Sequence, residues 1–300
     1  MMIRNFNDIL AKAKSKEIAS MVIPNPQSKR VLTAIYKAKA YGLIEPIIIG
    51  DRHSIEKNIS LFLGKHTDGY KIIDEPDSSR ALSRAIKILD DQEAKMIFQG
   101  DINIKEFFKA ITDDRHGITK ASSLSYVSLF ELPSEDRTIL LTDTYINEFP
   151  KLKQKVNILA NAVSLANSMG IEKPKVAALS MVELVNPDFR STTDAAILSK
   201  MSERGQLNAI VDGPLDIDCA SSFERAKRKG LNSPVSGDVD IYLLPDIESG
   251  YSIVEVLTFL GGAKTAGALM GSKIPIILNL RFESADSILI DIALATLRNQ

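Results

Sequence analysis

The residue of this chain that is most clearly suited to chemistry is an arginine that follows an apolar run. Arg281 comes just after the strand-like run Ile274–Leu278. A guanidinium near the buried end of a sheet needs an anionic partner, and its planar set of N–H donors suits phosphate and carboxylate groups. The adjacent run supplies no acidic residue. We therefore predict that Arg281 contacts an anionic ligand and takes part in catalysis.

Acidic residues follow two other apolar runs. Asp143 comes after Thr138–Leu141, and the segment Asp212–Asp218 places three carboxylates after Ala209–Val211. Carboxylates in such places can act as general bases, but they also cap the first turn of a following helix. For Asp212–Asp218 taken alone the capping interpretation is favoured, and for Asp143 both remain open.

Short β-branched runs recur along the chain, and most are followed by a polar loop and then by helical spacing. This order is typical of parallel βα units, in which ligands bind at the loops after the strands. The runs are Met21–Ile23, Pro46–Ile49, Met96–Phe98, Thr138–Leu141, Val176–Leu179, Ala209–Val211, Ile241–Leu244 and Ile274–Leu278. The candidate loop residues are Gln99, Gly100, Thr142, Asp143, Ser180, Asp212, Gly213, Asp246, Glu248 and Arg281.

Composition excludes several classes of function. Lys and Arg total 37 against 38 Asp and Glu, so no basic field is available for a nucleic acid polymer. One cysteine cannot form an internal disulfide, and no Cys/His group has zinc spacing. No apolar stretch approaches the roughly 20 residues that span a bilayer. We expect a soluble cytoplasmic protein without a metal ion.

Three further motifs favour structural interpretations. Gly261–Gly267 fails the phosphate-loop spacing, so we expect small residues that allow close helix packing. The absence of G-x-G-x-x-G disfavours a Rossmann oxidoreductase. The basic cluster Arg225–Lys229 is predicted to be a solvated helix face rather than a phosphate site.

Apolar spacing also locates helices and a domain crossing. Leu152, Val156 and Leu159 begin a helix that should end at Gly170, and the polar turn Pro133–Arg137 is a plausible crossing between domains. A chain of 300 residues favours two packed units. We predict one domain from residues 1–136 with 271–300, and a second from 137–270.

A set of ordered segments resembles the phosphate acetyl/butyryltransferase family, most closely its butyryltransferase-like branch, from about Pro46 to Leu297. The segments include Pro174–Ser180, Thr193–Ala196, Val211–Leu215, Leu244–Gly250, Gly262–Lys264 and Lys273–Leu278. The resemblance implies two α/β domains with mostly parallel sheets, an isocitrate/isopropylmalate dehydrogenase-like fold and a cleft between the domains. It further implies a homodimer, and the reaction of acyl-CoA with phosphate to give acyl phosphate and CoA, with coenzyme A as a substrate and no cofactor.

The resemblance also implies roles for single residues. In the family an arginine with a neighbouring serine steadies the phosphate and the oxyanion, and a carboxylate takes the thiol proton of CoA. Arg281 fits the arginine, Asp286 is the nearest acid to the expected position, and Thr142, Asp143 and Asn147 are expected to line the cleft.

The sequence departs from the family pattern where phosphate and CoA should bind. Leu280 stands in place of the serine, Ser287 in place of the acid, Gln99 in place of a lysine and Thr119 in place of an arginine. These losses predict a slow or inactive acyltransferase. The alternative is an impaired member that binds CoA or acyl phosphate in a regulatory role, and a dehydrogenase of the same superfamily is less favoured because no metal-binding acid cluster occurs.

Overall fold

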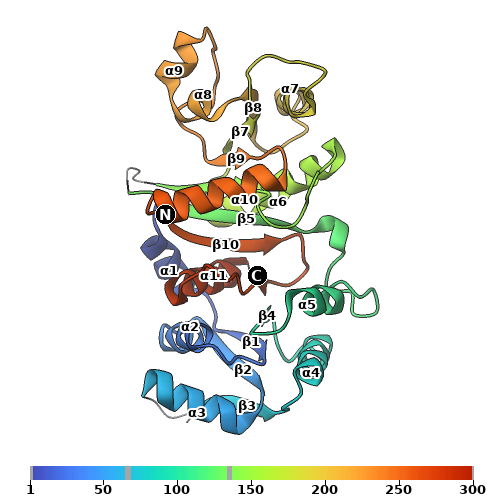
Figure 1. The fold of residues 1–300 in the computed structure, drawn as a ribbon, viewed down its shortest axis with the longest axis vertical. Helices are drawn as coiled ribbons and strands as arrows, with labels where there is room; N and C mark the ends of the chain where they lie inside the picture. Colours follow the sequence, from blue (N-terminus) through green and yellow to red (C-terminus); the bar gives the residue numbers. More distant parts are fainter. Residues whose placement is uncertain (1–2, 65–68, 134–136, 299–300) are drawn as a thin grey trace. The chain divides into compact units, whose positions relative to one another are not determined.

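The computed structural model describes residues 3–64, 69–133 and 137–298, and the chain forms two compact units. The first, which we call the N-terminal unit, comprises Phe6–Leu124 and Ala266–Gln300; the second, the central unit, comprises Met1–Asn5 and Ser125–Thr265. In both units strands alternate with helices along the chain (Figure 1). The predicted α/β class is therefore confirmed.

The N-terminal unit contains a largely parallel sheet with strand order β3-β2-β1-β4-β11-β10. Its strands are β1 (Ala19–Pro24), β2 (Ile44–Gly50), β3 (Lys71–Asp74), β4 (Met96–Phe98), β10 (Lys264–Met270) and β11 (Ile276–Ile277). β10 runs antiparallel to β11, with Leu269 opposite Ile276, and β11 lies parallel to β4. This register brings the segments that follow β4 and β11 to the same edge of the sheet.

Helices cover both faces of this sheet. On one side lie α1 (Phe6–Lys14), α2 (Lys29–Ala40), α3 (Arg52–Leu63) and α11 (Ala285–Arg298), and on the other α4 (Ser78–Asp90) and α5 (Ile104–Ile111) (Figure 1). Asp51, Asp77 and Asn103 begin α3, α4 and α5, where their side chains accept backbone N–H groups of the first turn. The 3-10 turn η1 (Ala121–Ser123) lies just before Leu124, where the first segment of this unit ends.

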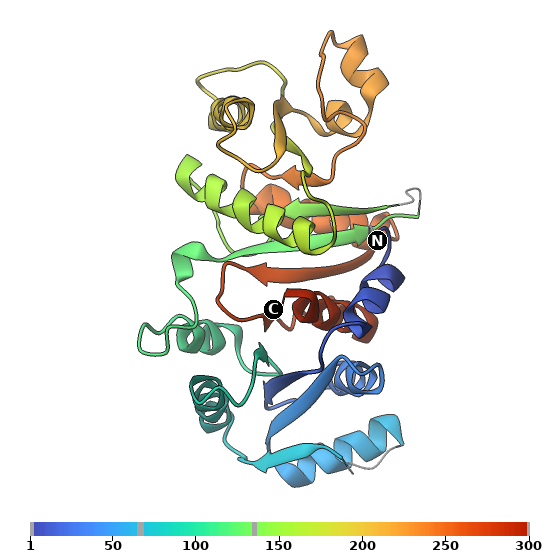
Figure 2. The same ribbon diagram turned by 180° about the vertical axis from the view of Figure 1, so that it is seen from behind.

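The central unit has the strand order β5-β6-β9-β7-β8. Its strands are β5 (Ser125–Glu131), β6 (Thr138–Thr142), β7 (Lys175–Leu179), β8 (Ile210–Leu215) and β9 (Ile241–Leu243); β5 and β6 pair antiparallel and the other pairs are parallel. α10 (Ile247–Glu255) covers one face and α6 (Leu152–Ser168) the other, as the two opposite views show (Figures 1 and 2). The remaining helices are α7 (Arg190–Glu203), α8 (Ile217–Ser221), α9 (Phe223–Arg228) and the π-helical turn η2 (Val256–Leu260).

Every apolar run predicted to be a strand contains or overlaps one, and α6 ends before Gly170, whose φ of +96° suits a residue after a helix. The prediction for Gly261–Gly267 is wrong. Lys264–Met270 forms β10, which is buried from Thr265 onward, because small side chains fit a strand covered on both faces as well as they fit a helix contact.

The units divide at residues 124/125 and 265/266, whereas the sequence pattern placed the crossings at 136/137 and 270/271. The first difference has a clear cause. The residues that flank the polar turn Pro133–Arg137 pair as a hairpin, with Phe130 opposite Ile139, so the turn belongs to one unit. Its residues 134–136 lie outside the described part of the chain.

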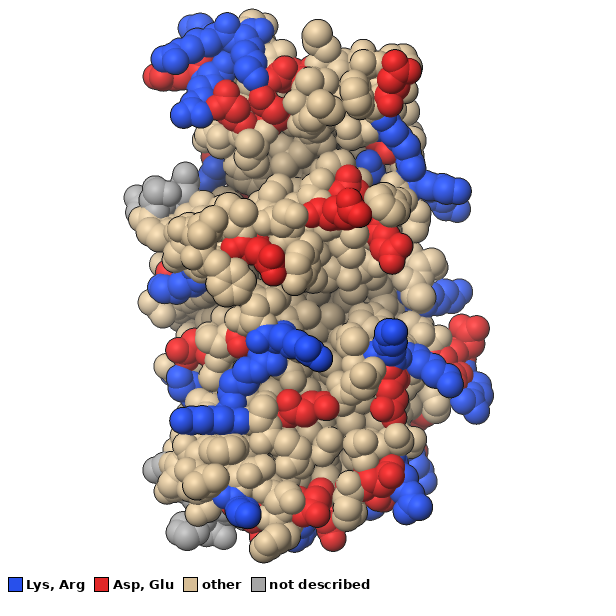
Figure 3. Space-filling model, in the orientation of Figure 1, with Lys and Arg blue, Asp and Glu red and all other residues tan. Residues whose placement is uncertain are grey.

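The surface carries both signs of charge. Basic side chains gather at one end of the face drawn in Figure 3, over α9, where Arg225, Lys227 and Arg228 are exposed. This confirms the predicted solvated helix face. Among the described residues, each helix is too short or too polar to cross a membrane.

Candidate active site

A pocket of about 500 Å³ lies in the N-terminal unit beside Arg281; we call it the arginine pocket. It is formed after β4, after β11 and at the start of α5. Its lining residues are Arg30, Gln99, Asp101, Ile102, Asn103, Ile104, Asn279, Leu280 and Arg281. Arg281 is exposed, and within residues 3–64, 69–133 and 137–298 its guanidinium makes no hydrogen bond or ion pair. The N–H donors of Arg281 are therefore available to an anion, which the predicted contact with an anionic ligand requires.

Gln99 is buried at the wall of this pocket and uses both ends of its amide. Its Oε1 accepts the backbone N–H of Asn279 at 2.9 Å, and its Nε2 donates to the carbonyl of Ile102 at 2.7 Å. The neutral amide thus joins the segments after β4 and β11. Gln99 shapes the pocket, and a substrate contact at this residue stays a prediction.

Gly100 permits the close approach of two backbone segments. It has a φ of +64°, and a Cβ added there would lie 1.8 Å from the carbonyl oxygen of Pro24. Only glycine fits such a position. The side chain of Asn279 donates to the Gly100 carbonyl at 2.6 Å, which fastens the same segment from the other side.

Asp101 is the acidic residue of the arginine pocket. One carboxylate oxygen accepts the backbone N–H groups of Gln27 and Ser28 at 2.6 and 2.9 Å, next to the start of α2. This contact satisfies N–H groups at a helix start and places negative charge where the helix dipole favours it.

Asp286, the predicted base, lies outside this pocket lining. It is in the first turn of α11, its side chain is 77% exposed, and it pairs with Lys37 at 2.6 Å. Thr119 is buried and also absent from the lining. The predicted replacement of an arginine by Thr119 therefore concerns a site away from the arginine pocket.

A second pocket, of about 680 Å³, lies in the central unit at the carboxyl ends of β7, β8 and β9; we call it the central pocket. Of the predicted residues it contains Ser180 and Asp246. Ser180 shares a hydrogen bond of 2.8 Å with Ser191, and Asp246 begins α10 by accepting the N–H of Ser249. Glu248 is exposed in the same turn of α10 and is not part of the lining.

The central pocket also contains cations that the sequence reasoning missed. Lys155 is 5% exposed, and its ammonium pairs with the buried carboxylate of Asp194 at 2.9 Å. Arg190 lies 3.5 Å from the same carboxylate and is half exposed. A lysine in the first turn of a helix gives no signal of this kind in the sequence, because its partner Asp194 lies on α7, later in the chain.

Asp143 organises the loop after β6. Its carboxylate accepts the backbone N–H groups of Tyr126, Tyr145, Ile146 and Asn147, together with the side-chain amide of Asn147 at 2.5 Å. Burial raises the pKa of Asp143, against the opposing effect of these donors. Thr142 is also buried and donates to the Tyr126 carbonyl. The geometry brings Thr142, Asp143 and Asn147 together, while a base role for Asp143 stays a prediction.

Asp212 and Gly213 lie within β8, away from the lining of the central pocket. Asp212 borders a separate depression of about 420 Å³ and accepts the N–H of Gly213. A Cβ on Gly213 would lie 2.6 Å from the carbonyl oxygen of Ala178, so this glycine allows β7 and β8 to pack closely. The capping role predicted for this segment belongs to Asp216, which accepts the N–H of Cys219 at the start of α8.

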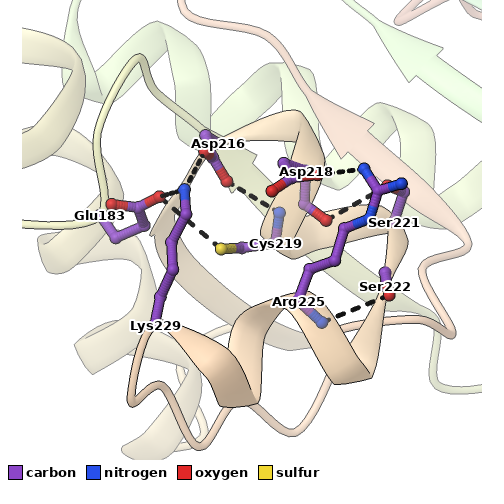
Figure 4. A network of polar contacts seen from close by, with 8 residues as sticks. All are labelled: Glu183, Asp216, Asp218, Cys219, Ser221, Ser222, Arg225 and Lys229. Carbon is purple, nitrogen blue, oxygen red and sulfur yellow. Dashed lines mark hydrogen bonds and ion pairs between the residues drawn. The ribbon is translucent and has the colours of Figure 1, made fainter.

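Beside the central pocket, Glu183, Asp216 and Cys219 form a cluster around Lys229 (Figure 4). The ammonium of Lys229 bonds to both carboxylates. Burial opposes the charged form of Asp216, but the bonds from Lys229 and Cys219 lower its pKa to about 2. Burial raises the pKa of the Cys219 thiol to about 12. Both carboxylates of the cluster are thus bound to an internal cation, and the Cys219 thiol donates to Glu183.

Comparison with known proteins defines the class. The family model described as phosphate acetyl/butaryl transferase matches residues 78–296. The phosphate butyryltransferase of Clostridium acetobutylicum is 38% identical over 297 residues, which cover 99% of this chain and 98% of that protein. With the α/β fold and the arginine pocket, these matches define an enzyme of the phosphate acyltransferase class.

Solved structures agree with this class. A branched-chain phosphotransacylase from Enterococcus faecalis has a TM-score of 0.81 at 26% identity, covering 94% of this chain and all of that one. A putative 4-hydroxythreonine-4-phosphate dehydrogenase from Salmonella typhimurium, at 13% identity and a TM-score of 0.58, covers 93% of this chain and 99% of its own and shares the fold alone. The chain belongs to the phosphate acetyl/butyryltransferase family. The dehydrogenase-like fold is confirmed, and nothing in these comparisons favours the impaired, regulatory alternative.

Proposed function

We propose that this enzyme transfers a short acyl group between CoA and inorganic phosphate, and that Arg281 is its anion-binding catalytic residue. The observation that carries the assignment is the exposed guanidinium of Arg281, which has no protein partner among the described residues and lines a pocket of about 500 Å³. An arginine free to donate several N–H groups suits a phosphate or a developing oxyanion.

In the proposed reaction an oxygen of phosphate attacks the thioester carbonyl carbon of acyl-CoA. The carbonyl π electrons move to oxygen, and Arg281 stabilises the resulting negative charge. When the carbonyl re-forms, the carbon–sulfur bond breaks and CoA leaves as a thiolate, which takes up a proton. In the reverse direction a carboxylate must remove that thiol proton.

Asp286 remains our candidate for this carboxylate, because it follows Arg281 closely and its oxygens face solvent and Lys37. Asp143 is a weaker candidate, since five N–H contacts already occupy its oxygens. Ser180 and Asp246, which share the central pocket, are proposed to contact substrate. The chemistry needs no metal ion or prosthetic group.

Ligand protection tests the role of Arg281 separately from turnover. CoA and acyl phosphate should each raise the melting temperature of the wild-type protein, and Arg281→Ala should lose this shift while its unliganded melting temperature stays unchanged. The exposed Arg115, whose side chain pairs with Asp113, offers a matched control variant, Arg115→Ala. Equal ligand shifts in Arg281→Ala and the wild type would refute the assignment.

We also propose a cytoplasmic homodimer. Support for the dimer comes from exposed apolar side chains on η2: Val256 is 53% exposed, Phe259 64% and Leu260 83%. They lie at the end of α10 next to an apolar groove of about 460 Å³. An exposed patch of this kind is typical of a protein interface. Light scattering after size exclusion should give a dimer for the wild type and a monomer for Leu260→Asp; a monomeric wild type would refute the proposal.

A further inference from the structure

The turn that carries Arg281 is held from outside by another arginine. Residues Leu280–Glu283 form this turn, closed by the Glu283 N–H and the Leu280 carbonyl at 3.2 Å. The Nη1 atom of Arg30 donates to the carbonyl of Leu280 and, at 2.9 Å, to that of Glu283. Arg281 therefore lies in the chain between two carbonyls that are bound to one nitrogen, and these bonds restrain its backbone.

Arg30 stands in a place that local helix energetics disfavour. It is in the first turn of α2, which contains no acidic residue of its own, and a cation near a helix N-terminus is opposed by the helix dipole. The carboxylate of Asp101, bound to the N–H groups of Gln27 and Ser28, lowers this cost. The sequence separation between Arg30 and the turn is 250 residues, so the contact is purely tertiary. Bonds from a charged donor to two carbonyls offset the local cost.

The far end of the turn is fixed inside the unit. The side chain of Glu283 is 4% exposed, next to Asp291 of α11, which is 3% exposed. An oxygen of Asp291 accepts the N–H of Gly267 in β10 at 2.6 Å. The turn is thus anchored to the core on one side, and Arg30 holds it on the side of the pocket.

We infer that Arg30 is a positioning residue for catalysis: by binding the carbonyls of Leu280 and Glu283 it sets the place of the Arg281 guanidinium in the arginine pocket. The inference deepens the proposed function and rests on it for its kinetic consequence. Arg30 also lines the pocket, but the contacts that carry this role are those to the two carbonyls.

The test combines hydrogen exchange of the unliganded protein with kinetics, for Arg30→Met, Arg30→Lys and a matched control. Arg52→Met is the control, since Arg52 also donates to a backbone carbonyl at 2.6 Å, that of Ile72 in β3, which is not part of this turn. We expect Arg30→Met to speed exchange of the amides of residues 279–284 by about tenfold, from the loss of two charge-assisted bonds. Arg30→Lys, which keeps a donor, should recover part of this effect, and Arg52→Met should not show it.

The kinetic arm uses butyryl-CoA and phosphate. Arg30→Met should lower kcat by about 10²-fold, in the range seen when a donor to an oxyanion is lost, with a smaller change in KM for butyryl-CoA and partial rescue by Arg30→Lys. Unchanged exchange at residues 279–284 in Arg30→Met would overturn the inference, as would faster exchange with unchanged kcat. If the wild type itself releases no CoA, the proposed function fails, and the exchange result alone decides whether Arg30 holds the turn.

Discussion

The Oε1 atom of Gln99 accepts the backbone N–H of Asn279 at 2.9 Å, so one side chain at the end of β4 fixes the segment that leads to Arg281. The resemblance to the family places a lysine at this position. In this protein both ends of the neutral amide bond to backbone groups, since its Nε2 also donates to the Ile102 carbonyl. We therefore interpret Gln99 as a residue that builds the arginine pocket.

Gln99→Glu should destabilise the protein. The substitution removes the Nε2 donor and leaves a buried carboxylate facing the Ile102 carbonyl, which should lower the free energy of unfolding by about 3 kcal/mol. Urea denaturation measures the change. The exposed Gln92 provides the control, because Gln92→Glu should stay within about 0.5 kcal/mol of the wild type. Equal stability of the two variants would show that the amide of Gln99 is dispensable.

Breaking the buried ion pair of Lys155 and Asp194 should destabilise the protein strongly, whereas replacing both residues by apolar ones should change its stability little. Asp194→Ala leaves a lysine that is 5% exposed without its carboxylate, and we expect a loss of about 3–5 kcal/mol in the free energy of unfolding. The double variant Lys155→Met with Asp194→Leu should recover most of it. Lys200→Met, which breaks the exposed pair with Glu203, should cost at most about 1 kcal/mol. A double variant as unstable as Asp194→Ala would contradict this account.

Asp291 should make stability fall as pH rises. Burial raises its pKa well above the ordinary value of 3.8, and the neighbouring Glu283 raises it further. At a pH between 3.8 and the raised pKa of Asp291, the folded protein keeps a proton that the unfolded chain has lost. The free energy of unfolding therefore declines with increasing pH in this range. Asp291→Asn should flatten this slope by up to about 1.4 kcal/mol per pH unit.

Urea denaturation at several pH values above 4 gives this slope. The exposed Asp91 serves as the control, and Asp91→Asn should keep the wild-type slope. Parallel stability curves for the wild type and Asp291→Asn would mean that Asp291 is already ionised in the folded protein.

Leu280→Ser should raise turnover. Leu280 lines the arginine pocket beside Arg281, where the family resemblance implies a serine, and a hydroxyl there could donate to the oxyanion. Loss of one such donor costs about 10²–10³-fold in other enzymes, so its return should raise kcat, whereas Leu280→Ala should not. A wild-type kcat already in the ordinary range of about 1–10³ per second would show that the missing hydroxyl is compensated.

The local pattern of apolar and polar residues predicted most of the strands, because β-branched runs flanked by polar loops are typical of buried strands. The strands it missed have weaker signals. β3 has one buried residue, the apolar residues of β5 are interrupted by Ser128, and β10 is rich in alanine and glycine. The first division between the units, at residues 124/125, precedes β5, because polar composition near Pro133 does not distinguish a connection within a unit from one between units.

The candidate site was predictable where a residue follows its own strand, as Arg281 follows β11. It was not predictable where function depends on contacts between distant segments. Arg30 looks like an ordinary solvated helix residue until the sheet order places α2 near the turn after β11. Likewise, the donors that occupy Asp143 are mostly backbone N–H groups of its own loop, which no pattern of side chains reveals.

The measurement that tests the central claim most directly is phosphate-dependent release of CoA from butyryl-CoA and acetyl-CoA, by the wild type, Arg281→Ala and the control Arg115→Ala. We predict that the wild type and Arg115→Ala release CoA only when phosphate is present. Arg281→Ala should fold normally and lose about 10²–10³-fold in kcat/KM. A wild type that releases no CoA from either substrate, or an Arg281→Ala variant as active as Arg115→Ala, would contradict the account.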